Sequence, residues 1–125
     1  MTTQRKLALC ALVVAVALAL LPLATLLAAE RDYQKAWCDA HGGKMEVTMP
    51  DNTRADCVTA THAIEFDFAP KWAEAIGQSL HYAALTGKQA GVVLIMAPGD
   101  EKFRSRFLTT TASFCLRIDL WEVSK

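Results

Sequence analysis

The chain opens on a long apolar run and then changes to short segments whose hydrophobic spacing switches between helix and strand periods. Residues 7–29, LALCALVVAVALALLPLATLLAA, carry no charge, and Arg5 and Lys6 stand just before them. Basic residues followed by an apolar run are typical of an export signal, and this run is also about long enough to cross a bilayer. We therefore predict a removed signal peptide or an uncleaved membrane anchor over residues 1–29. In either case residues 30–125 lie outside the cytoplasm, because the basic end stays inside.

The rest of the chain predicts one α/β domain. Apolar residues spaced i, i+4, i+5 indicate a first helix, which Gly42 and Gly43 end. GVVLIM, at residues 91–96, is a continuous apolar run that suits a strand buried on both faces. Three strands followed by helical crossovers predict a mixed sheet flanked by helices, with residues 91–96 as its central strand. The expected order is a helix over 30–41, strands over 44–49, 54–59 and 62–68, a helix from Pro70 to about Leu85, a strand over 91–96, a helix over 100–112 and a strand over 114–123.

The net charge of this domain bears on whether it binds nucleic acid. Without Arg5 and Lys6 it holds 11 Lys and Arg against 13 Asp and Glu, which gives a net charge of −2. Nucleic acid is therefore a partner that the net charge does not support, and binding it would need a local basic patch. Lys102, Arg104 and Arg106 are candidates for such a patch, beside their alternative interpretation as a solvated helix face. The oligomeric state stays open.

Three of the four cysteines belong to the exported part, where an oxidising compartment favours disulfides. Three thiols allow one bridge, although all three can also be buried and reduced. We predict a bridge between Cys38 and Cys57, because both follow apolar-face positions and the first helix must lie on the sheet next to the second strand. Cys115, on the predicted last strand, would stay free.

Acidic residues and one lysine suggest a site. Glu65 and Asp67 share one face of the strand over 62–68, and Asp56 lies on the preceding strand, where it can stand beside Glu65. Carboxylate oxygens of this kind suit a hard divalent cation such as Mg²⁺. Lys71, at the start of the next helix, is placed to reach back towards them, and Glu46 on the first strand is a further candidate ligand. The alternative interpretation is that Glu65 and Asp67 lie on a solvated face of the strand and that Lys71 belongs to a solvated polar stripe of the helix.

Together and in order, these residues resemble the PD-(D/E)XK nuclease superfamily. The resemblance is carried by an acid on the second strand, an E-x-D stretch on the third and a Q-x-x-x-Y helix element; these are Asp56, Glu65 to Asp67, and Gln78 to Tyr82. It implies a restriction-endonuclease-like αβββαβ core. It also implies that Asp56 and Glu65 bind metal and that Gln78 and Tyr82 belong to the helix that supports the site; Asp67 is a further candidate metal ligand.

The chain departs from the superfamily at one position. The superfamily's lysine belongs two residues after the acid, where this chain has Asp67. Members are known in which the lysine has moved to the following helix, and Lys71 is placed for that role. The expected function is an exported or membrane-anchored, metal-dependent, nuclease-like protein that acts on phosphodiesters with Mg²⁺ or Mn²⁺. The alternative is a catalytically inactive relative that serves as a periplasmic or membrane-anchored interaction module.

Overall fold

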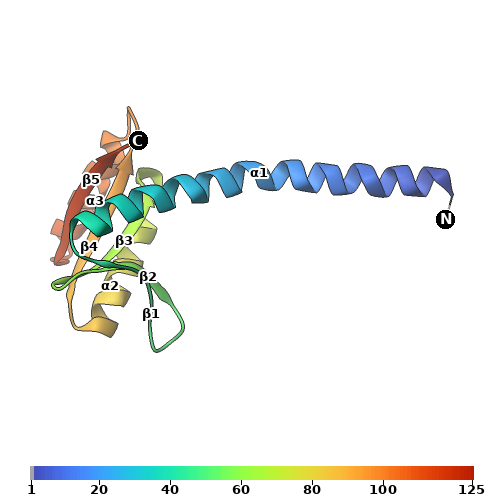
Figure 1. Ribbon diagram of the computed structural model, residues 1–125. Helices are drawn as coiled ribbons and strands as arrows, with labels where there is room; N and C mark the ends of the chain where they lie inside the picture. The colour runs from blue at the N-terminus through green and yellow to red at the C-terminus, as the bar shows by residue number, and fades with distance from the viewer. Residues whose placement is uncertain (1) are drawn as a thin grey trace.

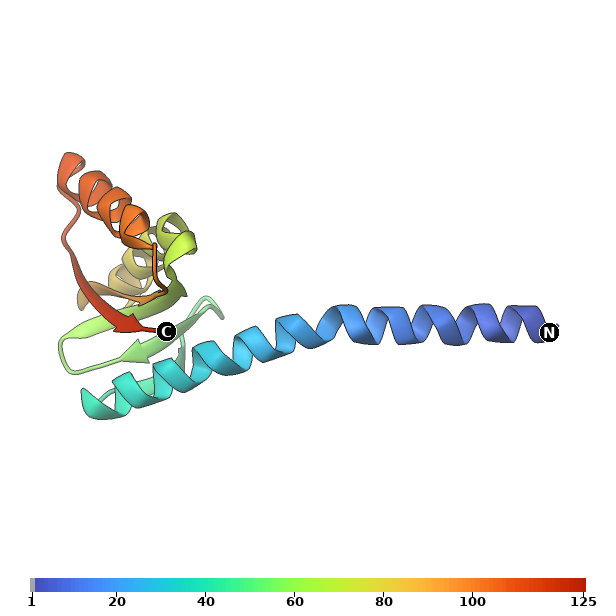
Figure 2. The same ribbon diagram turned by 90° about the horizontal axis from the view of Figure 1, so that it is seen from above.

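In the computed structural model, which describes residues 2–125, the apolar segment and the first domain helix form one continuous helix. This helix, α1, spans Thr3–Ala40 and extends far beyond the rest of the chain (Figures 1 and 2). Its apolar part is long enough to cross a membrane and is not buried against the domain, and it has the position of a signal sequence. Together with the disulfide described below, α1 indicates export or membrane anchoring. Met1, the first residue of the predicted export segment, lies outside the described residues.

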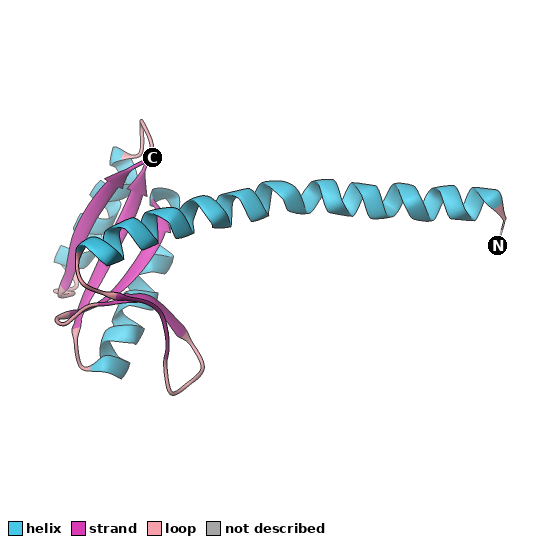
Figure 3. Ribbon diagram, viewed as in Figure 1, coloured by secondary structure: helices cyan, strands magenta, loops and turns pink. Residues whose placement is uncertain are grey.

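The domain is a five-stranded mixed sheet with α1 on one face and two further helices on the other (Figure 3). The elements after α1 are β1 (Lys44–Thr48), β2 (Arg54–Val58), β3 (His62–Phe68), a 3₁₀ turn (Ala69–Lys71), α2 (Trp72–Thr86), β4 (Gln89–Met96), α3 (Glu101–Ser113) and β5 (Ile118–Ser124). The strand order is β1-β2-β3-β4-β5, antiparallel from β1 to β3 and parallel from β3 to β5. The predicted α/β class and element order are confirmed.

The continuous apolar run forms an internal strand, as predicted. β4 lies between β3 and β5, and all its residues except the two at its ends are buried. Helices cover both faces of the parallel part of the sheet, so both alternating sets of β4 side chains must be apolar. The middle position of the sheet itself belongs to β3.

Two apolar cores use the alternating residues of these strands. On the α1 side, Trp37 packs against Phe66 and Val93, and the ring centroids of Trp37 and Phe66 lie 5.6 Å apart. On the other side, Val92 and Leu94 pack under α2 and α3. The first helix is thus held on the sheet by an aromatic contact.

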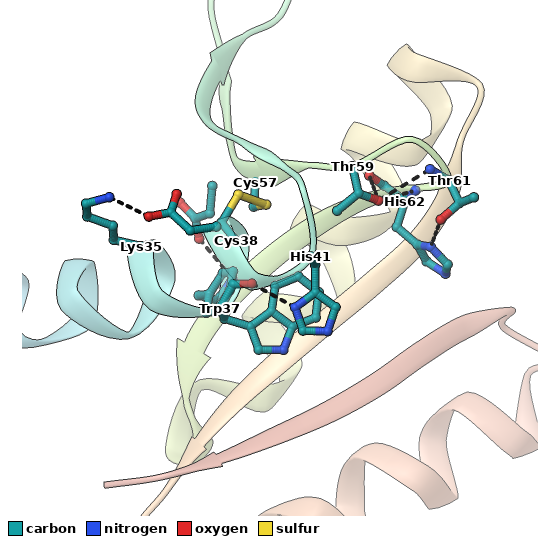
Figure 4. Close-up of a disulfide and its surroundings, with 11 residues drawn as sticks. Lys35, Trp37, Cys38, His41, Cys57, Thr59, Thr61 and His62 are labelled. Atoms are coloured by element: carbon teal, nitrogen blue, oxygen red, sulfur yellow. Dashed lines mark hydrogen bonds and ion pairs between the residues drawn. A yellow bond between two sulfur atoms is a disulfide. The ribbon is translucent and has the colours of Figure 1, made fainter.

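A disulfide also ties α1 to the sheet (Figure 4). Cys38 near the end of α1 is bonded to Cys57 of β2, with their Cα atoms 6.0 Å apart, and this confirms the predicted pair. Gly43 passes directly over the bridge: a Cβ atom there would lie 2.5 Å from Sγ of Cys57 and 2.6 Å from Sγ of Cys38. Only glycine leaves room for this close approach. Cys10 and Cys115 are free and exposed.

The predicted last strand begins too early, and this is corrected by the structure. Residues 114–117 form the turn after α3, so Cys115 lies in this turn, with φ at 52°, rather than on β5. The N–H of Leu116 donates to the carbonyl oxygen of Thr111 at 2.8 Å. The helix end therefore uses this segment to satisfy its unpaired carbonyls, and strand pairing starts only at Ile118.

Candidate metal centre between β2, β3 and α1

The backbone pairing of β2 with β3 ends next to Asp56, and the side chain of Asp56 replaces the next backbone acceptor. The pairing of the two strands reaches Cys57 opposite Ile64. One step further, the N–H of Phe66 donates to Oδ2 of Asp56 at 2.9 Å. A side-chain oxygen thus replaces a backbone acceptor. The bond holds Asp56 against β3 next to Glu65, as the sequence predicts.

Glu65 and Asp67 are buried, with only 6% and 5% of their surface exposed, so the interpretation as a solvated strand face is wrong. They lie on the side of β3 that α2 covers. Burial raises the pKa of Asp67 to about 7, even though the positive charge of Lys71 lowers it. Burial, followed by the charge of Asp56, raises the pKa of Glu65 far above its usual range. These carboxyls therefore retain protons at a pH where exposed carboxyls are ionised.

One carboxyl oxygen of Glu65 has no hydrogen-bond partner among the described residues. Oε2 of Glu65 is buried and makes no hydrogen bond to any of residues 2–125. Burial also raises the pKa of Asp56, although the N–H of Phe66 acts against this shift. Buried Glu65 and half-buried Asp56 lie side by side, and such a pair needs either a shared proton or a cation. The pKa of Glu65 is raised further than that of Asp56, because Glu65 is the more deeply buried of the two side chains and faces the charges of both Asp56 and Asp67.

α1 contributes a carboxylate that the sequence analysis did not select. The charge of Glu30 raises the pKa values of Asp56, Glu65 and Asp67, so it faces the same region. Gln34 is buried and donates Nε2 to Oε1 of Glu30 at 3.2 Å. The spacing of this polar pair, one helical turn apart on the docked face of α1, is the signal that would have pointed to it.

A cavity of about 380 Å³ opens between Asp56 and α1. Glu46, which the sequence analysis proposed as an additional ligand, lines this cavity and accepts a hydrogen bond from Nη1 of Arg31 at 3.2 Å. Its carboxylate is thus paired with a guanidinium, and its charge contributes to raising the pKa of Asp56. Arg54 lines the same cavity, which gives it both acidic and basic walls.

The helix residues expected at the site lie in different environments. Lys71 is exposed, and its charge lowers the pKa values of Asp67 and Glu30. It forms no ion pair within 4.0 Å with residues 2–125. Gln78 is half-buried. Tyr82 is buried in an apolar cluster beneath β2, so the alternative interpretation as a solvated helix stripe does not hold for this residue. The ring carries enough apolar surface to join the core.

The candidate basic patch on α3 is engaged within its own chain. Nε of Arg104 lies 3.5 Å from Oε1 of Glu122. Nζ of Lys102 and the guanidinium of Arg106 lie 5.0 Å and 5.5 Å from the ring centre of Phe103. All three cations therefore have an intramolecular contact.

The residues present fit a loosely held divalent cation rather than a closed metal cage. Within residues 2–125, no three side chains of His, Cys, Asp or Glu are gathered closely enough to hold a metal ion by themselves. Mg²⁺ is commonly bound by one or two carboxylates and keeps several waters, so Asp56 and the unpartnered oxygen of Glu65 suit it. No protein-family model, curated protein or solved structure matches the chain. The resemblance to the nuclease superfamily rests on the residues named above and stays a prediction.

Proposed function

We propose that the protein is an exported or membrane-anchored, metal-dependent, nuclease-like phosphodiesterase with a restriction-endonuclease-like core. The observation that carries this proposal is the pair formed by half-buried Asp56 and buried Glu65, in which Oε2 of Glu65 lacks a partner. Protonated Glu65 and Asp56 hydrogen-bond to each other, and a cation can take the place of the shared proton when the pH rises. A site that exchanges a proton for a cation accounts for that oxygen.

Each residue has a separate task in this proposal. Asp56 and Glu65 hold Mg²⁺ or Mn²⁺, and Asp67 and Glu30 add negative charge around it. When bound, the ion supplies charge neutralisation on a phosphodiester and an acidified water. Lys71, exposed beside Asp67, stabilises the negative charge that develops on the phosphate.

The residues of α2 act through packing in this proposal. Tyr82 is buried against β2 and its pKa, raised by burial to about 12, is also raised by the charges of Glu65 and Asp56. Its neutral ring therefore packs in the apolar cluster beneath β2. Gln78, one helical turn earlier and half-buried, adds an amide to the same helix.

The proposal is tested by measuring metal binding and cleavage on the same variants. Titration calorimetry at pH 8 should show binding of Mg²⁺ or Mn²⁺ that weakens as the pH falls, because protons compete for Asp56 and Glu65. Asp56→Asn and Glu65→Gln should abolish both binding and cleavage of single- or double-stranded DNA or RNA. Lys71→Ala should keep metal binding and lower cleavage about 100-fold, which is typical for removing one charge-stabilising group.

A matched control and a rescue sharpen this test. Asp32→Asn removes an exposed carboxylate on α1 and should change neither property. Asp67→Lys rebuilds the superfamily's E-x-K arrangement and should restore cleavage to the Lys71→Ala variant. If neither the parent protein nor Asp67→Lys cleaves any of these substrates with either metal, the enzymatic proposal is wrong.

The second candidate is a catalytically inactive interaction module with the same fold. Asp67 favours it, because a third acid stands where the superfamily has its lysine. In that function Glu65 and Asp56 share a proton permanently, and the acidic region is a fold element. A folded protein that binds no divalent cation at pH 8 and cleaves nothing would support the module.

A further inference from the structure

A second cavity, of about 320 Å³, lies between α1 and the ends of β3 and β4. Leu26, Phe68 and Ile95 give it an apolar lining, and Lys71 and Lys125 place two ammonium groups in its walls. This combination of apolar surface and paired cations differs from the acidic cavity beside Asp56.

α1 sets the depth of this cavity relative to a bilayer. About 20 residues run from Leu7 to Leu26, and at 1.5 Å per residue they span about 30 Å, the thickness of a hydrocarbon core. Lys6 marks the cytoplasmic boundary of that span. When α1 crosses the membrane, Leu26 therefore reaches the outer boundary, and the cavity lies in the headgroup layer. No loop intervenes, since α1 continues as a helix to Ala40.

Two cations line the cavity, although Lys71 also lies near the charges of Asp67 and Glu30. Within residues 2–125, neither Lys71 nor Lys125 forms an ion pair within 4.0 Å. Nζ of Lys125 lies 5.4 Å from the ring centre of Phe68, which points the ammonium over the apolar lining. The one acid in the wall, Asp100, accepts a hydrogen bond from the N–H of Ala97 at 2.9 Å and serves the turn before α3.

We propose that this cavity binds the headgroup phosphate of an anionic phospholipid from the outer leaflet of the membrane that α1 enters. Lys71 and Lys125 contact the phosphate, and Leu26, Phe68 and Ile95 contact the first carbons of the lipid. A lipid matches the site better than a soluble phosphate, because the apolar lining continues directly into the membrane-spanning part of α1. The proposal goes beyond phosphodiester cleavage and holds whether or not the Asp56 site is catalytic.

The test uses the full chain in detergent micelles with added phosphatidylglycerol or phosphatidylcholine, and native mass spectrometry counts bound lipids. We expect one phosphatidylglycerol per chain and an affinity about 25-fold above that for phosphatidylcholine, which is the product of the two lysine contributions. Each lysine near a membrane surface contributes about 1 kcal/mol, which is about 5-fold in affinity. Lys125→Gln should therefore lower the affinity about 5-fold, and the Lys71→Gln, Lys125→Gln double variant should bind the two lipids equally.

Three further measurements make the outcome decisive. The Lys44→Gln, Lys102→Gln control removes two exposed lysines outside the cavity and should keep the preference. Soluble glycerol phosphate should fail to displace the lipid at equal concentration. The Lys125→Gln variant should lose lipid while keeping any Mg²⁺-dependent cleavage, which separates this proposal from the proposed function.

Several results would overturn the lipid site. These are equal binding of the two lipids by the parent chain, unchanged binding in the double variant, displacement by glycerol phosphate, and a purified natural protein that begins after residue 29 and so lacks Leu26.

Discussion

The two faces of β3 are equally hidden from water but differ in what that burial does to the free energy of folding. Phe66 is 1% exposed and packs against Trp37, whereas its neighbour Glu65 is 6% exposed and leaves a carboxyl oxygen without a partner. Burying the ring stabilises the fold, and burying the acid costs stability until a proton or a cation compensates. One strand thus carries a structural face and a chemical face in alternate positions.

Removing the aromatic contact should produce the largest effect. Phe66→Ala leaves a cavity in the core between α1 and the sheet and should lower the free energy of unfolding by about 3–5 kcal/mol. Phe114→Ala is the matched control, because Phe114 is 73% exposed and its loss should change the stability by less than about 0.5 kcal/mol. Urea denaturation followed by circular dichroism measures both. Similar losses in the two variants would contradict the assignment of Phe66 to the structural face.

The disulfide should have the next largest effect on the α1 side. Cys38 and Cys57 are 19 residues apart, and closing a loop of this size stabilises by about 3 kcal/mol in the chain-entropy model. The Cys38→Ser, Cys57→Ser variant should lose about this amount in urea denaturation, and reducing agent should then have no further effect. Cys115→Ser, which removes an exposed free thiol, should leave the stability unchanged. An equal loss on Cys115→Ser would show that another bridge forms.

The sequence predicted the structural face well because periodicity reports directly on it. The alternation of residues 62–68 and the apolar run of residues 91–96 placed β3 and β4, and the cysteine pair followed from where the first helix had to lie. The start of β5 was missed because Phe114 and Leu116 continue an alternating pattern that the helix end uses as a turn. The alternation of apolar and polar residues does not reveal which backbone N–H groups will bond to the unpaired carbonyls at a helix end.

The sequence predicted which acidic residues lie on the chemical face, but it did not predict that they are buried. The sequence brought Asp56 beside Glu65, because the two residues lie on consecutive strands of a hairpin. It left open whether Glu65 and Asp67 are solvated, since alternation separates two faces without saying what covers them. Glu30 was missed for the same reason. Its distance from Asp56 and Glu65 depends on how α1 crosses the sheet where the pairing of β2 and β3 ends.

The chemical face should respond to pH in the opposite direction from ordinary surface acids. The pKa of Asp67 is raised from 3.8 to about 7, so its contribution to stability is present below about pH 4 and is lost as the pH rises through about 7. The protein should therefore become less stable from pH 5 to pH 8. Asp67→Asn should be more stable than the parent at pH 8 by up to about 4 kcal/mol, since the pKa rises from 3.8 to about 7 and one pKa unit corresponds to about 1.4 kcal/mol.

Urea denaturation at pH 5 and pH 8 measures this effect in the metal-free protein. Asp32→Asn, on the exposed side of α1, should follow the parent at both values. If Asp67→Asn is destabilised at pH 8, Asp67 is ionised and favourably paired in the folded protein, and the burial argument fails. Saturating Mg²⁺ should restore part of the stability lost by the parent, because a cation that binds only the folded state stabilises it.

The smallest expected effect belongs to the ion pair of Arg31 and Glu46, which bridges α1 and β1 at the rim of the acidic cavity. Nη1 of Arg31 lies 3.2 Å from Oε1 of Glu46, but the arginine side chain is 65% exposed. Exposed pairs of this kind contribute about 0–1 kcal/mol and are screened by salt. A double-mutant cycle with Arg31→Ala and Glu46→Ala should give a coupling energy below about 1 kcal/mol that vanishes at 1 M NaCl. α1 is therefore held on the structural face of the sheet by a covalent bond and an aromatic ring, whereas its ion pair with β1 is weak and exposed. A coupling energy above about 2 kcal/mol would instead make this pair a structural element in its own right.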